Sequence, residues 1–479
     1  LQVEAAIKDR GQVLARTNSD DAVAVATFTP TPTPTPIFTP TPTPSPTPEF
    51  VEARANTNAN ARSGPSTQYG RVGQLASGQA YRVVGQNDAG TWLQLLLNGK
   101  EVWVSGELLS LSGNIEGVAV VEVAPPPTAA PVAAAPKAAP STGTNLPAAG
   151  TGYFGYGIQI DPYGDRSQAI GMIQGMGFGW VKFQLPWKDF EGSPGAKNFP
   201  DDVINQLSGA GLKILVSIVK APNWARPGNT DFSVEGPPTD PGTYADYVAA
   251  FAARYKGRVQ AIEVWNEQNL WYEWGHEPLD PGRYVTLLCR AYNAIKAADP
   301  GMVVVSGALT PTGLNDGSTA IDDLVYLQRM YAAGAKGCFN AVGAHPSGYN
   351  NPPDAKFGYS NPAEPSFKNH PSFFFRDTME RYRAVMVANG DSGKRIWPTE
   401  FGWASTSSPV SGYEYARDIT EQEQAEYIVR SYQMMKGWGW VGPAFLWNLN
   451  YNLTAPGKEL AAFGIAGRPA WGALASMPK

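Results

Sequence analysis

The stretch Ile214-Leu-Val-Ser-Ile-Val219 is apolar at every position except one. A continuous apolar run of this length is typical of a parallel strand that is buried on both faces, whereas a half-exposed strand alternates between apolar and polar residues. A helical pattern follows, with apolar side chains at intervals of three and four residues, at Tyr244, Tyr247, Val248, Phe251, Ala252 and Tyr255. A buried strand followed by a helix with one apolar face predicts a βα unit of a parallel sheet.

Similar apolar runs recur along residues 150 to 479 and alternate with helical patterns. The eight runs begin near Tyr153, Trp180, Lys213, Ala261, Met302, Ala341, Arg395 and Gly442. A doubly wound open sheet would also alternate in this way, but no Gly-x-Gly-x-x-Gly follows the first run. We therefore predict that this region is of the α/β class and folds as a (β/α)8, or TIM, barrel with its sites at the C-terminal ends of the strands.

Residues 53 to 113 show a different pattern, in which short alternating runs are separated by turn residues. Asn98-Gly99 lies between the apolar runs 92–96 and 102–104. An Asn-Gly pair between two such runs is the strongest local signal for a β-hairpin. These features predict a small all-β barrel domain in front of the large barrel.

Two segments have the composition of linkers. Thr and Pro alternate almost without interruption from Thr29 to Pro48, which predicts a polyproline II spacer of roughly 60 Å. Such tracts are either O-glycosylated stalks of exported proteins or unmodified linkers. The resulting division of the chain is a polar segment and stalk at 1–52, a β domain at 53–113, an Ala/Pro linker at 114–149 and a barrel at 150–479. We expect the β domain and the barrel to fold independently.

The composition argues against two kinds of partner. The net charge is −5 and the Lys and Arg residues are scattered, so the sequence lacks the basic stripe that neutralises the phosphates of a nucleic acid. It also lacks a run of about 18 apolar residues, which a membrane-spanning helix would need. The sequence opens at Leu1 rather than Met, and a removed leader or anchor and an arbitrary boundary explain this equally well. A membrane would be a partner only if an anchor preceded Leu1.

The two cysteines, Cys289 and Cys338, lie outside any Cys-x-x-Cys or Cys/His motif. This spacing argues against a zinc site, and we predict that the protein needs neither a metal nor an organic cofactor. It leaves open whether the two thiols form a disulfide, which depends on short distances between their Cα and Cβ atoms.

Two glutamates end strands of the predicted barrel. Glu267 closes Val264-Trp-Asn-Glu267 at the fourth strand, and Glu400 closes Trp397-Pro-Thr-Glu400 at the seventh. Cleavage of a glycosidic bond needs one carboxylic acid for the leaving oxygen and one carboxylate for the anomeric carbon. An aromatic, desolvated setting would raise the pKa of the acid and keep it protonated. The alternative is two structural glutamates in ion pairs.

This order of residues resembles the clan A glycoside hydrolases, particularly family 39-like and family 5-like members, over all of 150 to 479. The resemblance implies that Glu267 is the acid/base and Glu400 the nucleophile of a retaining enzyme. It also implies that Asn266, which precedes Glu267, binds the 2-hydroxyl of the sugar. His345 at the end of strand six would orient the substrate or the nucleophile, and Trp447 at the end of strand eight would form an aromatic floor.

The sequence departs from the family pattern in two places. Many relatives carry Arg on strand two, whereas this chain has Lys182, which keeps the charge but loses the planar fork of donors. Relatives often carry a nucleophile-contacting Tyr two residues after the strand-six His. Here that position is Ser347, and the sequence leaves open whether Tyr349 substitutes for it. These departures predict reduced activity or an unusual substrate.

Aromatic residues crowd the loops that would follow the strands, and their flat faces suit the C–H groups of sugars. They are Trp224, Trp271, Tyr272, Trp274, Tyr349, Trp403, Tyr413 and Tyr415. Loop packing is the alternative role for each of them. We take Trp224, Tyr349 and Trp403, together with Lys182, as candidate substrate-binding residues.

The β domain carries four ordered motifs: Ala61-Arg-Ser-Gly-Pro-Ser66, Gly73-x-Leu-x-x-Gly78, Trp92 and Gly99-x-x-Val-Trp-Val104. Together they closely resemble the bacterial Src-homology-3-like (SH3-like) domain. The resemblance implies a module that attaches to a cell wall or to another envelope polysaccharide.

We expect from these features a secreted or cell-surface hydrolase that cleaves β-glycosidic bonds of a polysaccharide or oligosaccharide, more readily inside the chain than at its end. Two alternatives remain at this point. One is a non-catalytic protein that binds glycans through a glycosidase-like barrel. The other is a structural component of the cell surface, in which the stalk and the β domain are the functional parts.

Overall fold

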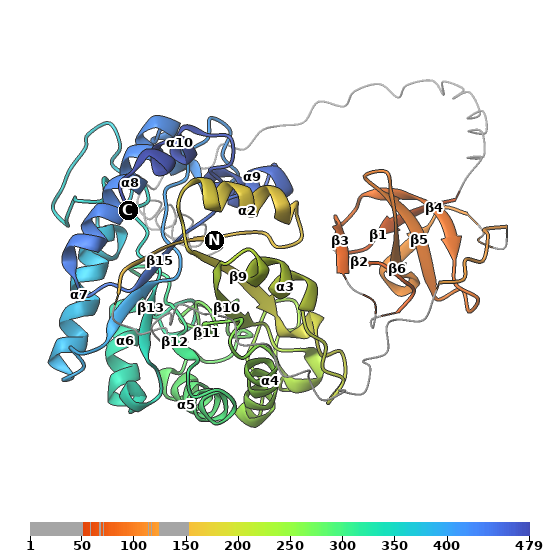
Figure 1. Ribbon diagram of the computed structural model, residues 1–479, viewed down its shortest axis with the longest axis horizontal. Coiled ribbons are helices and arrows are strands. Elements are labelled where there is room, and N and C mark those ends of the chain that lie inside the picture. The colour runs from red at the N-terminus through yellow and green to blue at the C-terminus, as the bar shows by residue number, and fades with distance from the viewer. Residues whose placement is uncertain are drawn as a thin grey trace, which may run out of the picture. The chain divides into compact units, whose positions relative to one another are not determined.

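The structure is a computed structural model that describes residues 51–123, except positions 58, 67, 68, 70, 114 and 116, and residues 153–479. Contacts between residues divide the chain into two compact units. The small unit holds β1 to β7, and the large unit holds β8 to α10 (Figure 1). The predicted stalk lies outside the described residues, as does most of the predicted Ala/Pro linker.

The small unit is one antiparallel sheet with the strand order β3-β2-β6-β5-β4-β1-β7. Its strands are β1 (Glu52–Ala55), β2 (Ala59–Arg62), β3 (Arg71–Leu75), β4 (Ala80–Gln86), β5 (Trp92–Leu97), β6 (Lys100–Ser105) and β7 (Leu109–Leu111). In the β5–β6 hairpin Leu97 pairs with Lys100, and Asn98 and Gly99 both have a positive φ, of 51° and 77°. Positive φ at both central residues is the requirement of a type I′ turn, so the predicted hairpin is confirmed.

The small unit extends beyond residue 113, where the sequence pattern placed its end. The backbone N–H of Val121 donates to the carbonyl of Gln86 in β4, and Ile115 and Val118 pack against the apolar core. The side chain of Gln86 donates to the carbonyls of Ile115 and Val118, at 3.0 and 2.9 Å. Residues 115 and 117–121 therefore belong to this unit rather than to the linker, to which the sequence pattern assigned them.

The large unit is a parallel barrel, which confirms the predicted fold class. Its strands are β8 (Gly155–Gln159), β9 (Trp180–Pro186), β10 (Lys213–Val219), β11 (Ala261–Val264), β12 (Val303–Ser306), β13 (Ala341–Ala344), β14 (Arg395–Pro398) and β15 (Pro443–Leu446). The strand order runs from β14 back to β8 and then to β15. Isolated parallel bridges, Ile396 to Val441 and Phe401 to Leu446, close the barrel between β14 and β15.

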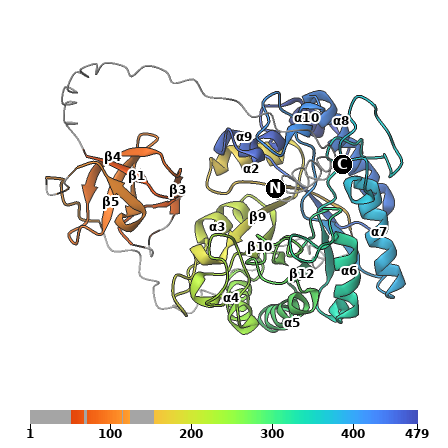
Figure 2. The ribbon, with the colours of Figure 1, turned by 180° about the vertical axis from the view of Figure 1, so that it is seen from behind.

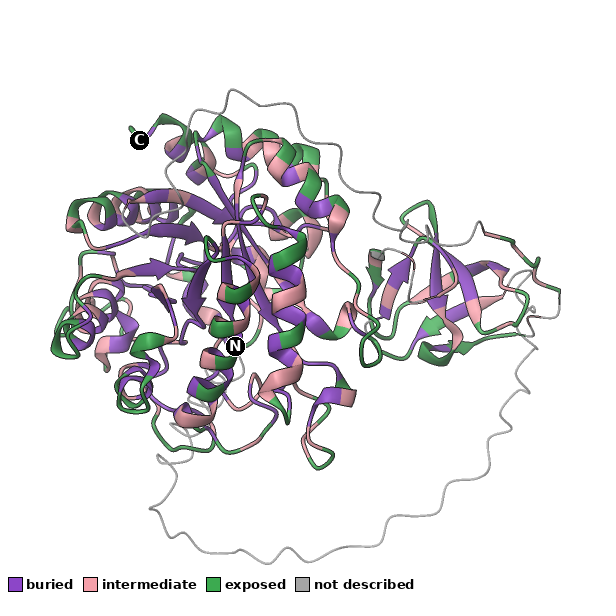
Figure 3. Ribbon diagram, turned by 60° about the horizontal axis from the view of Figure 1, so that its bottom comes forward, coloured by how far each residue is buried: buried purple, intermediate pink, exposed green. Residues whose placement is uncertain are grey.

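Helices surround the strands on the outside (Figure 2). They are α2 (Arg166–Gly175), α3 (Asp201–Gly209), α4 (Pro241–Arg254), α5 (Pro281–Ala298), α6 (Asp323–Ala332), α7 (Phe375–Ala388), α8 (Glu421–Trp438), α9 (Tyr451–Thr454) and α10 (Pro469–Ser476). Asp240 caps α4 through a bond from the N–H of Gly242, and the predicted apolar stripe is its buried face. Figure 3 shows the same arrangement, with buried strands inside helices whose outer faces are exposed.

The interior of the barrel consists of an apolar plug and a polar layer. The plug contains Trp180, Leu215, Ala261, Val303, Val305, Ala341, Trp397 and Phe445. Side chains two residues apart on a strand point to the same face. The interior positions that follow Trp180, Leu215, Ala261 and Trp397 are accordingly Lys182, Ser217, Glu263 and Thr399. A polar layer therefore lies at the C-terminal ends of these strands, directly above the plug.

Cys289 in α5 and Cys338 form a disulfide, with their Cα atoms 4.7 Å apart. This settles the pairing that the sequence left open. Among the described residues, no helix is both long and apolar enough to span a bilayer.

Candidate active site

Strained backbone marks the rim of the barrel at its C-terminal end. Lys220 after β10, Trp265 and Glu267 after β11, and Tyr349 after β13 all have a positive φ, between 50° and 75°. Residues other than glycine adopt this conformation at a cost of about 1–3 kcal/mol, and such residues cluster at functional sites. The strain therefore coincides with the strand ends that the sequence analysis singled out.

A cavity of about 430 Å³ opens at this rim. Of the predicted site residues it is lined by Asn266, Glu267, His345, Tyr349, Glu400 and Trp447. Its other lining residues include Gln184, Lys220, Glu273, Thr310, Tyr413, Tyr415, Tyr451, Glu459 and Phe463. The cavity thus brings together Gln184 of β9 and residues from the loops that follow six of the eight barrel strands, as expected for a barrel active site.

Glu400 is held by two donors from β9. Lys182 Nζ lies 2.8 Å from Glu400 Oε1, and Gln184 Nε2 donates to the same oxygen at 3.2 Å. The side chain of Lys182 is fully buried, whereas 14% of the Glu400 side chain is exposed. Glu400 is therefore a fixed carboxylate that presents its free side to the cavity.

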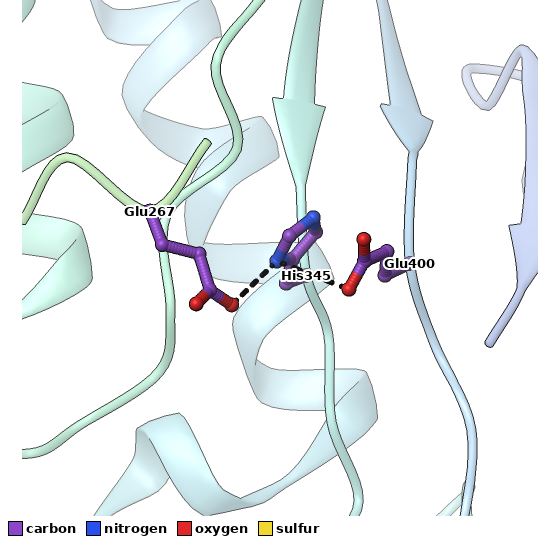
Figure 4. Close-up of side chains that lie close together, drawn as sticks. All are labelled: Glu267, His345 and Glu400. Atoms are coloured by element: carbon purple, nitrogen blue, oxygen red, sulfur yellow. Dashed lines mark hydrogen bonds and ion pairs between the residues drawn. The ribbon is translucent and has the colours of Figure 1, made fainter. Parts of the chain in front are cut away.

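Glu267 faces His345 rather than a permanent cation. His345 Nδ1 lies 2.9 Å from Glu267 Oε1 and 4.0 Å from Glu400 Oε2, between the two carboxylates (Figure 4). His345 is therefore closer to the predicted acid/base than to the predicted nucleophile.

This contact sets the protonation of both groups. Burial would raise the pKa of Glu267, but the hydrogen bond and charge of His345 outweigh burial and lower it to about 2. Burial would lower the pKa of His345, but the charge of Glu400 and the contact with Glu267 raise it above 6.5. A proton held by this pair therefore resides on His345. The expectation that Glu267 itself stays protonated is corrected, because the sequence did not show which group faces Glu267.

The two carboxylates lie close together. One oxygen of Glu267, one ring nitrogen of His345 and one oxygen of Glu400 all lie within 4.8 Å of one another. These donor types also bind transition metals, but a metal would need a deprotonated imidazole. The carboxylates instead raise the pKa of His345, and Glu400 is already paired with Lys182. The donors suit a proton-sharing cluster better than a metal site, and the absence of a metal requirement stays a prediction.

Comparison with known proteins agrees with the two folds. Residues 57–110 match the bacterial SH3 domain family. The small unit is a bacterial SH3 domain. A search of curated proteins with the whole sequence found no match.

Solved structures resemble the barrel. A family 39 glycoside hydrolase from Bacteroides cellulosilyticus WH2 is 18% identical with a TM-score of 0.51, covering 89% of this chain and 77% of that chain. A family 39 enzyme from Xanthomonas axonopodis pv. citri is 20% identical with a TM-score of 0.47, covering 67% and 65%. A family 39 β-xylosidase from Caulobacter crescentus has the same identity and TM-score, covering 67% and 70%. The first similarity shows that the large unit shares the family 39 fold.

Three predicted residues, Lys182, Trp224 and Trp403, do not line the cavity. Lys182 is fully buried between Glu400 and Glu263, so it contacts the proposed nucleophile rather than a substrate. Trp403 is fully buried, and its indole N–H donates to the carbonyl of Asn351 at 2.8 Å. Trp224 packs edge-on against Trp187 and donates to the carbonyl of Glu191 at 2.7 Å. Both indoles are therefore committed to packing in this structure, and neither is in a position to stack on a sugar in the cavity.

The remaining predictions are placed as follows. Trp447 lines the cavity with its ring centroid 5.3 Å from that of Tyr451, and the peptide bond that follows it is cis. The hydroxyl of Tyr349 donates to the carbonyl of Pro311 at 2.7 Å, and Ser347 also lines the cavity. Tyr349 therefore uses its hydroxyl to fix the neighbouring loop.

Sequence reasoning missed several polar residues of the site, among them Gln184, Glu263 and Glu273. Gln184 Nε2 links Glu400 to Asn266, whose Oδ1 lies 3.3 Å away, and Glu263 lies 3.5 Å from the Nζ of Lys182, which is paired with Glu400. Glu273 lines the cavity, and burial, together with the charge of Glu267, raises its pKa to about 8 against the opposing charge of Lys220. Gln184 lies two residues after Lys182 and therefore on the same face of the strand, and Glu263 is a charged residue inside an apolar strand. Both signals are present in the sequence. Nothing local distinguishes Glu273.

Proposed function

We propose that the protein is a retaining glycoside hydrolase that cleaves β-glycosidic bonds. The observation that carries this proposal is that one carboxylate oxygen of Glu267 and one of Glu400 lie within 4.8 Å of each other at the rim of a family 39-like barrel. Retaining enzymes hold their two carboxyl groups about 5 to 5.5 Å apart, whereas inverting enzymes leave about 6.5 to 9.5 Å for a water molecule. The spacing favours retention.

In the first step a Glu400 oxygen attacks the anomeric carbon and forms an ester bond to it. The bond from this carbon to the leaving oxygen breaks. The leaving oxygen takes a proton from Glu267, which receives that proton from His345 across their hydrogen bond. In the second step the pair accepts a proton from a water molecule. The water oxygen bonds to the anomeric carbon and the ester bond to Glu400 breaks. The enzyme ends in its starting state, and the configuration at the anomeric carbon is retained.

The proton is stored on His345 rather than on Glu267 in the free enzyme. His345 Nδ1 lies 2.9 Å from Glu267 Oε1, so the proton crosses one hydrogen bond as the leaving oxygen gains charge. General acid catalysis needs a proton donor whose pKa lies near the working pH. The raised pKa of His345 meets this need better than the lowered pKa of Glu267.

The rest of the cavity suits a sugar polymer. Asn266 adjoins Glu267 and would bind the sugar 2-hydroxyl, and the ring of Trp447 would lie under that sugar. Tyr413, Tyr415 and Phe463 line the cavity as well and offer further aromatic surface. An aromatic-lined cavity that is open to solvent supports action on an oligosaccharide or polysaccharide.

We propose further that the bacterial SH3 domain attaches the enzyme to a glycan-rich surface, such as a cell wall. The residues that line the cavity described above belong to the large unit. The proposal places the protein outside the cell or on its surface. The Cys289–Cys338 disulfide supports this, because disulfides persist mainly in oxidising compartments.

Hydrolysis of a panel of β-linked aryl glycosides and polysaccharides tests the function directly. We expect wild-type protein to release reducing sugar from at least one member, and Glu400→Gln protein to release none. The lowered pKa of Glu267 is the observation that favours the alternative, a barrel that binds glycans without cleaving them. Binding without hydrolysis across the whole panel would establish that alternative.

A further inference from the structure

A carboxylate on β11 lies beneath the proposed nucleophile and takes no part in the mechanism above. Glu263 is fully buried. Its Oε1 accepts hydrogen bonds from the hydroxyl of Thr399, at 2.7 Å, and from the backbone N–H of Ala308, at 3.2 Å. Its Oε2 accepts a hydrogen bond from the hydroxyl of Ser217. Donors from three other strands or their loops thus fix this one carboxylate.

Lys182 connects Glu263 to Glu400. Its Nζ lies 2.8 Å from Glu400 Oε1 and 3.5 Å from Glu263 Oε2, and the side chains of Lys182 and Glu263 are both 0% exposed. One buried cation is therefore shared by two carboxylates. Removing one partner of such a cluster leaves an uncompensated charge, so each member constrains the other two.

The backbone leaves room for this arrangement. Gly343 on β13 lies beside Glu263, and a Cβ added to it would lie 3.1 Å from Glu263 Oε1 and would collide with the carbonyl of Ser306. A side chain on β13 at this point would therefore displace Glu263. The absence of a side chain at Gly343 and the hydrogen-bond donors around Glu263 together form a site that fits a carboxylate.

We infer that Glu263 is a positioning residue for the nucleophile: it anchors Lys182 and shares its charge, so that Glu400 is held in place without being neutralised. The inference rests on the proposed function, in which Glu400 attacks the anomeric carbon. If Lys182 were paired with Glu400 alone, its full charge would weaken the nucleophile. The same charge would oppose the positive charge that develops on the sugar in the transition state.

The direction in which each substitution shifts the protonation of Glu400 distinguishes a positioning role of Glu263 from a merely structural one. In Glu263→Gln, Lys182 acts on Glu400 without its counter-charge, so Glu400 should become harder to protonate. In Lys182→Met, the charge of Glu263 acts on Glu400 without the cation, so Glu400 should become easier to protonate. In the double variant both charges are absent. A loss of packing alone predicts no such opposite shifts.

The measurement is a ¹³C NMR titration of the Glu400 carboxyl in full-length protein labelled at glutamate carboxyls, with the signal identified by its loss in Glu400→Gln. The expected order of titration midpoints, from low to high pH, is Glu263→Gln, wild type, the double variant and Lys182→Met. The readout needs no substrate. It therefore tests the charge coupling between Glu263, Lys182 and Glu400 even if the panel of glycosides shows no hydrolysis. An absence of hydrolysis would contradict the proposed function but not this coupling.

Kinetics on an aryl glycoside that the wild type cleaves provide the second readout. We expect Glu263→Gln to lower kcat by about 10- to 100-fold, the size of one charge interaction in a protein interior, and to leave KM almost unchanged. Glu191→Gln is the matched control. Glu191 is another buried carboxylate of the barrel, and it accepts hydrogen bonds from Trp187 and Gly195 at 2.7 and 2.8 Å. This control should lower the melting temperature without changing kcat.

An unchanged or raised midpoint in Glu263→Gln, or a kcat equal to that of Glu191→Gln, would overturn the inference. If Glu263→Gln does not fold, the double variant and Lys182→Met decide the question, because a neutral pair is tolerated in place of a buried ion pair. A midpoint in the double variant below that of Lys182→Met supports the inference. Equal midpoints in these two variants overturn it.

Discussion

Glu267 and Glu400 carry the same functional group, but the side chains that face them differ. Glu400 accepts hydrogen bonds from Lys182 and Gln184, at 2.8 and 3.2 Å, whereas Glu267 faces His345 at 2.9 Å. A lysine keeps its charge across the physiological range, and a histidine loses its charge near neutral pH. The proposed nucleophile is therefore paired with a residue of constant charge, whereas the proposed acid/base is paired with a residue that can give up a proton.

The two glutamates should respond differently to the same substitution. Glu400→Gln should abolish turnover, because an amide does not form the glycosyl intermediate. Glu267→Gln should lower kcat by about 10²- to 10⁴-fold, and least for leaving groups that depart without a proton. Steady-state rates on aryl glycosides with leaving groups of graded acidity measure this. Wild-type turnover by Glu400→Gln, or a product of inverted configuration by NMR, would end the proposal.

The Glu267–His345 pair should also set the pH dependence. Its raised pKa gives His345 a stabilising contribution that is full below about 6.5 and is lost as the pH rises through the raised value. The lowered pKa of Glu267 gives a contribution that is present above about 4.5 and is lost as the pH falls towards 2. The pair should therefore stabilise the fold most between these values, and kcat/KM should fall on the alkaline side as His345 loses its proton.

His345→Gln tests both parts. Its melting temperature should lie furthest below that of the wild type between about pH 4.5 and 6.5, where the free energy of unfolding should fall by about 1–3 kcal/mol. The difference should be smaller at pH 9. The alkaline limb of its kcat/KM profile should no longer report the imidazole. An identical alkaline limb in the variant and the wild type would show that His345 does not carry the proton.

At the scale of secondary-structure elements, the alternation of side chains along each strand separates the plug from the site. On β9, Trp180 belongs to the apolar plug, while Lys182 and Gln184 contact Glu400. A single strand thus supplies both core and site, because residues two apart share a face. The neighbouring helices bury the opposite faces of the strands, and α5 carries one of the two cysteines of the disulfide.

The disulfide should stabilise the barrel without affecting chemistry. It joins α5 to the segment after α6 across 49 residues of sequence, away from the cavity. Replacing both cysteines by serine should lower the free energy of unfolding by about 2–4 kcal/mol, through the greater entropy of the unfolded chain. Thermal unfolding with and without reductant measures this. A matching loss of kcat below the melting temperature would contradict it.

At the scale of the whole molecule, the proposed chemistry and the proposed attachment belong to different units. Every charged residue that lines the cavity lies between Lys220 and Glu459, in the large unit. The bacterial SH3 domain has its own apolar core, built on Ala53, Leu75, Leu93, Val104 and neighbouring residues. Each unit buries its own core, so the proposed division of function follows the division of the fold.

Deleting residues 1–149 should therefore leave kcat on a soluble aryl glycoside within about twofold of wild type, while weakening retention on an insoluble wall glycan. Rate assays and pull-down with the insoluble glycan measure the two effects separately. A large loss of turnover on the soluble substrate would show that the SH3 domain shapes the active site. Equal retention of both proteins on the glycan would remove the attachment proposal.

The sequence by itself determined the elements and the positions of the two carboxylates. The eight strands begin within about two residues of their predicted starts, and the Asn98-Gly99 hairpin has the predicted turn. The pattern around Glu267 and Glu400 placed both at strand ends. These features depend on the periodicity of apolar residues and on turn chemistry, which are properties of neighbouring residues in the chain.

Only the tertiary structure decided which side chains meet. Closure of the barrel brings Gln184 and Lys182 to Glu400 and His345 to Glu267, and packing of the outer layer brings Cys289 to Cys338. It also buries Trp403, which the sequence analysis took for a substrate-binding residue. Distances, burial and pKa values arise between residues that lie tens to hundreds of positions apart, so no local pattern encodes them. Strand periodicity fixes which face a residue occupies, and closure alone fixes what it contacts there.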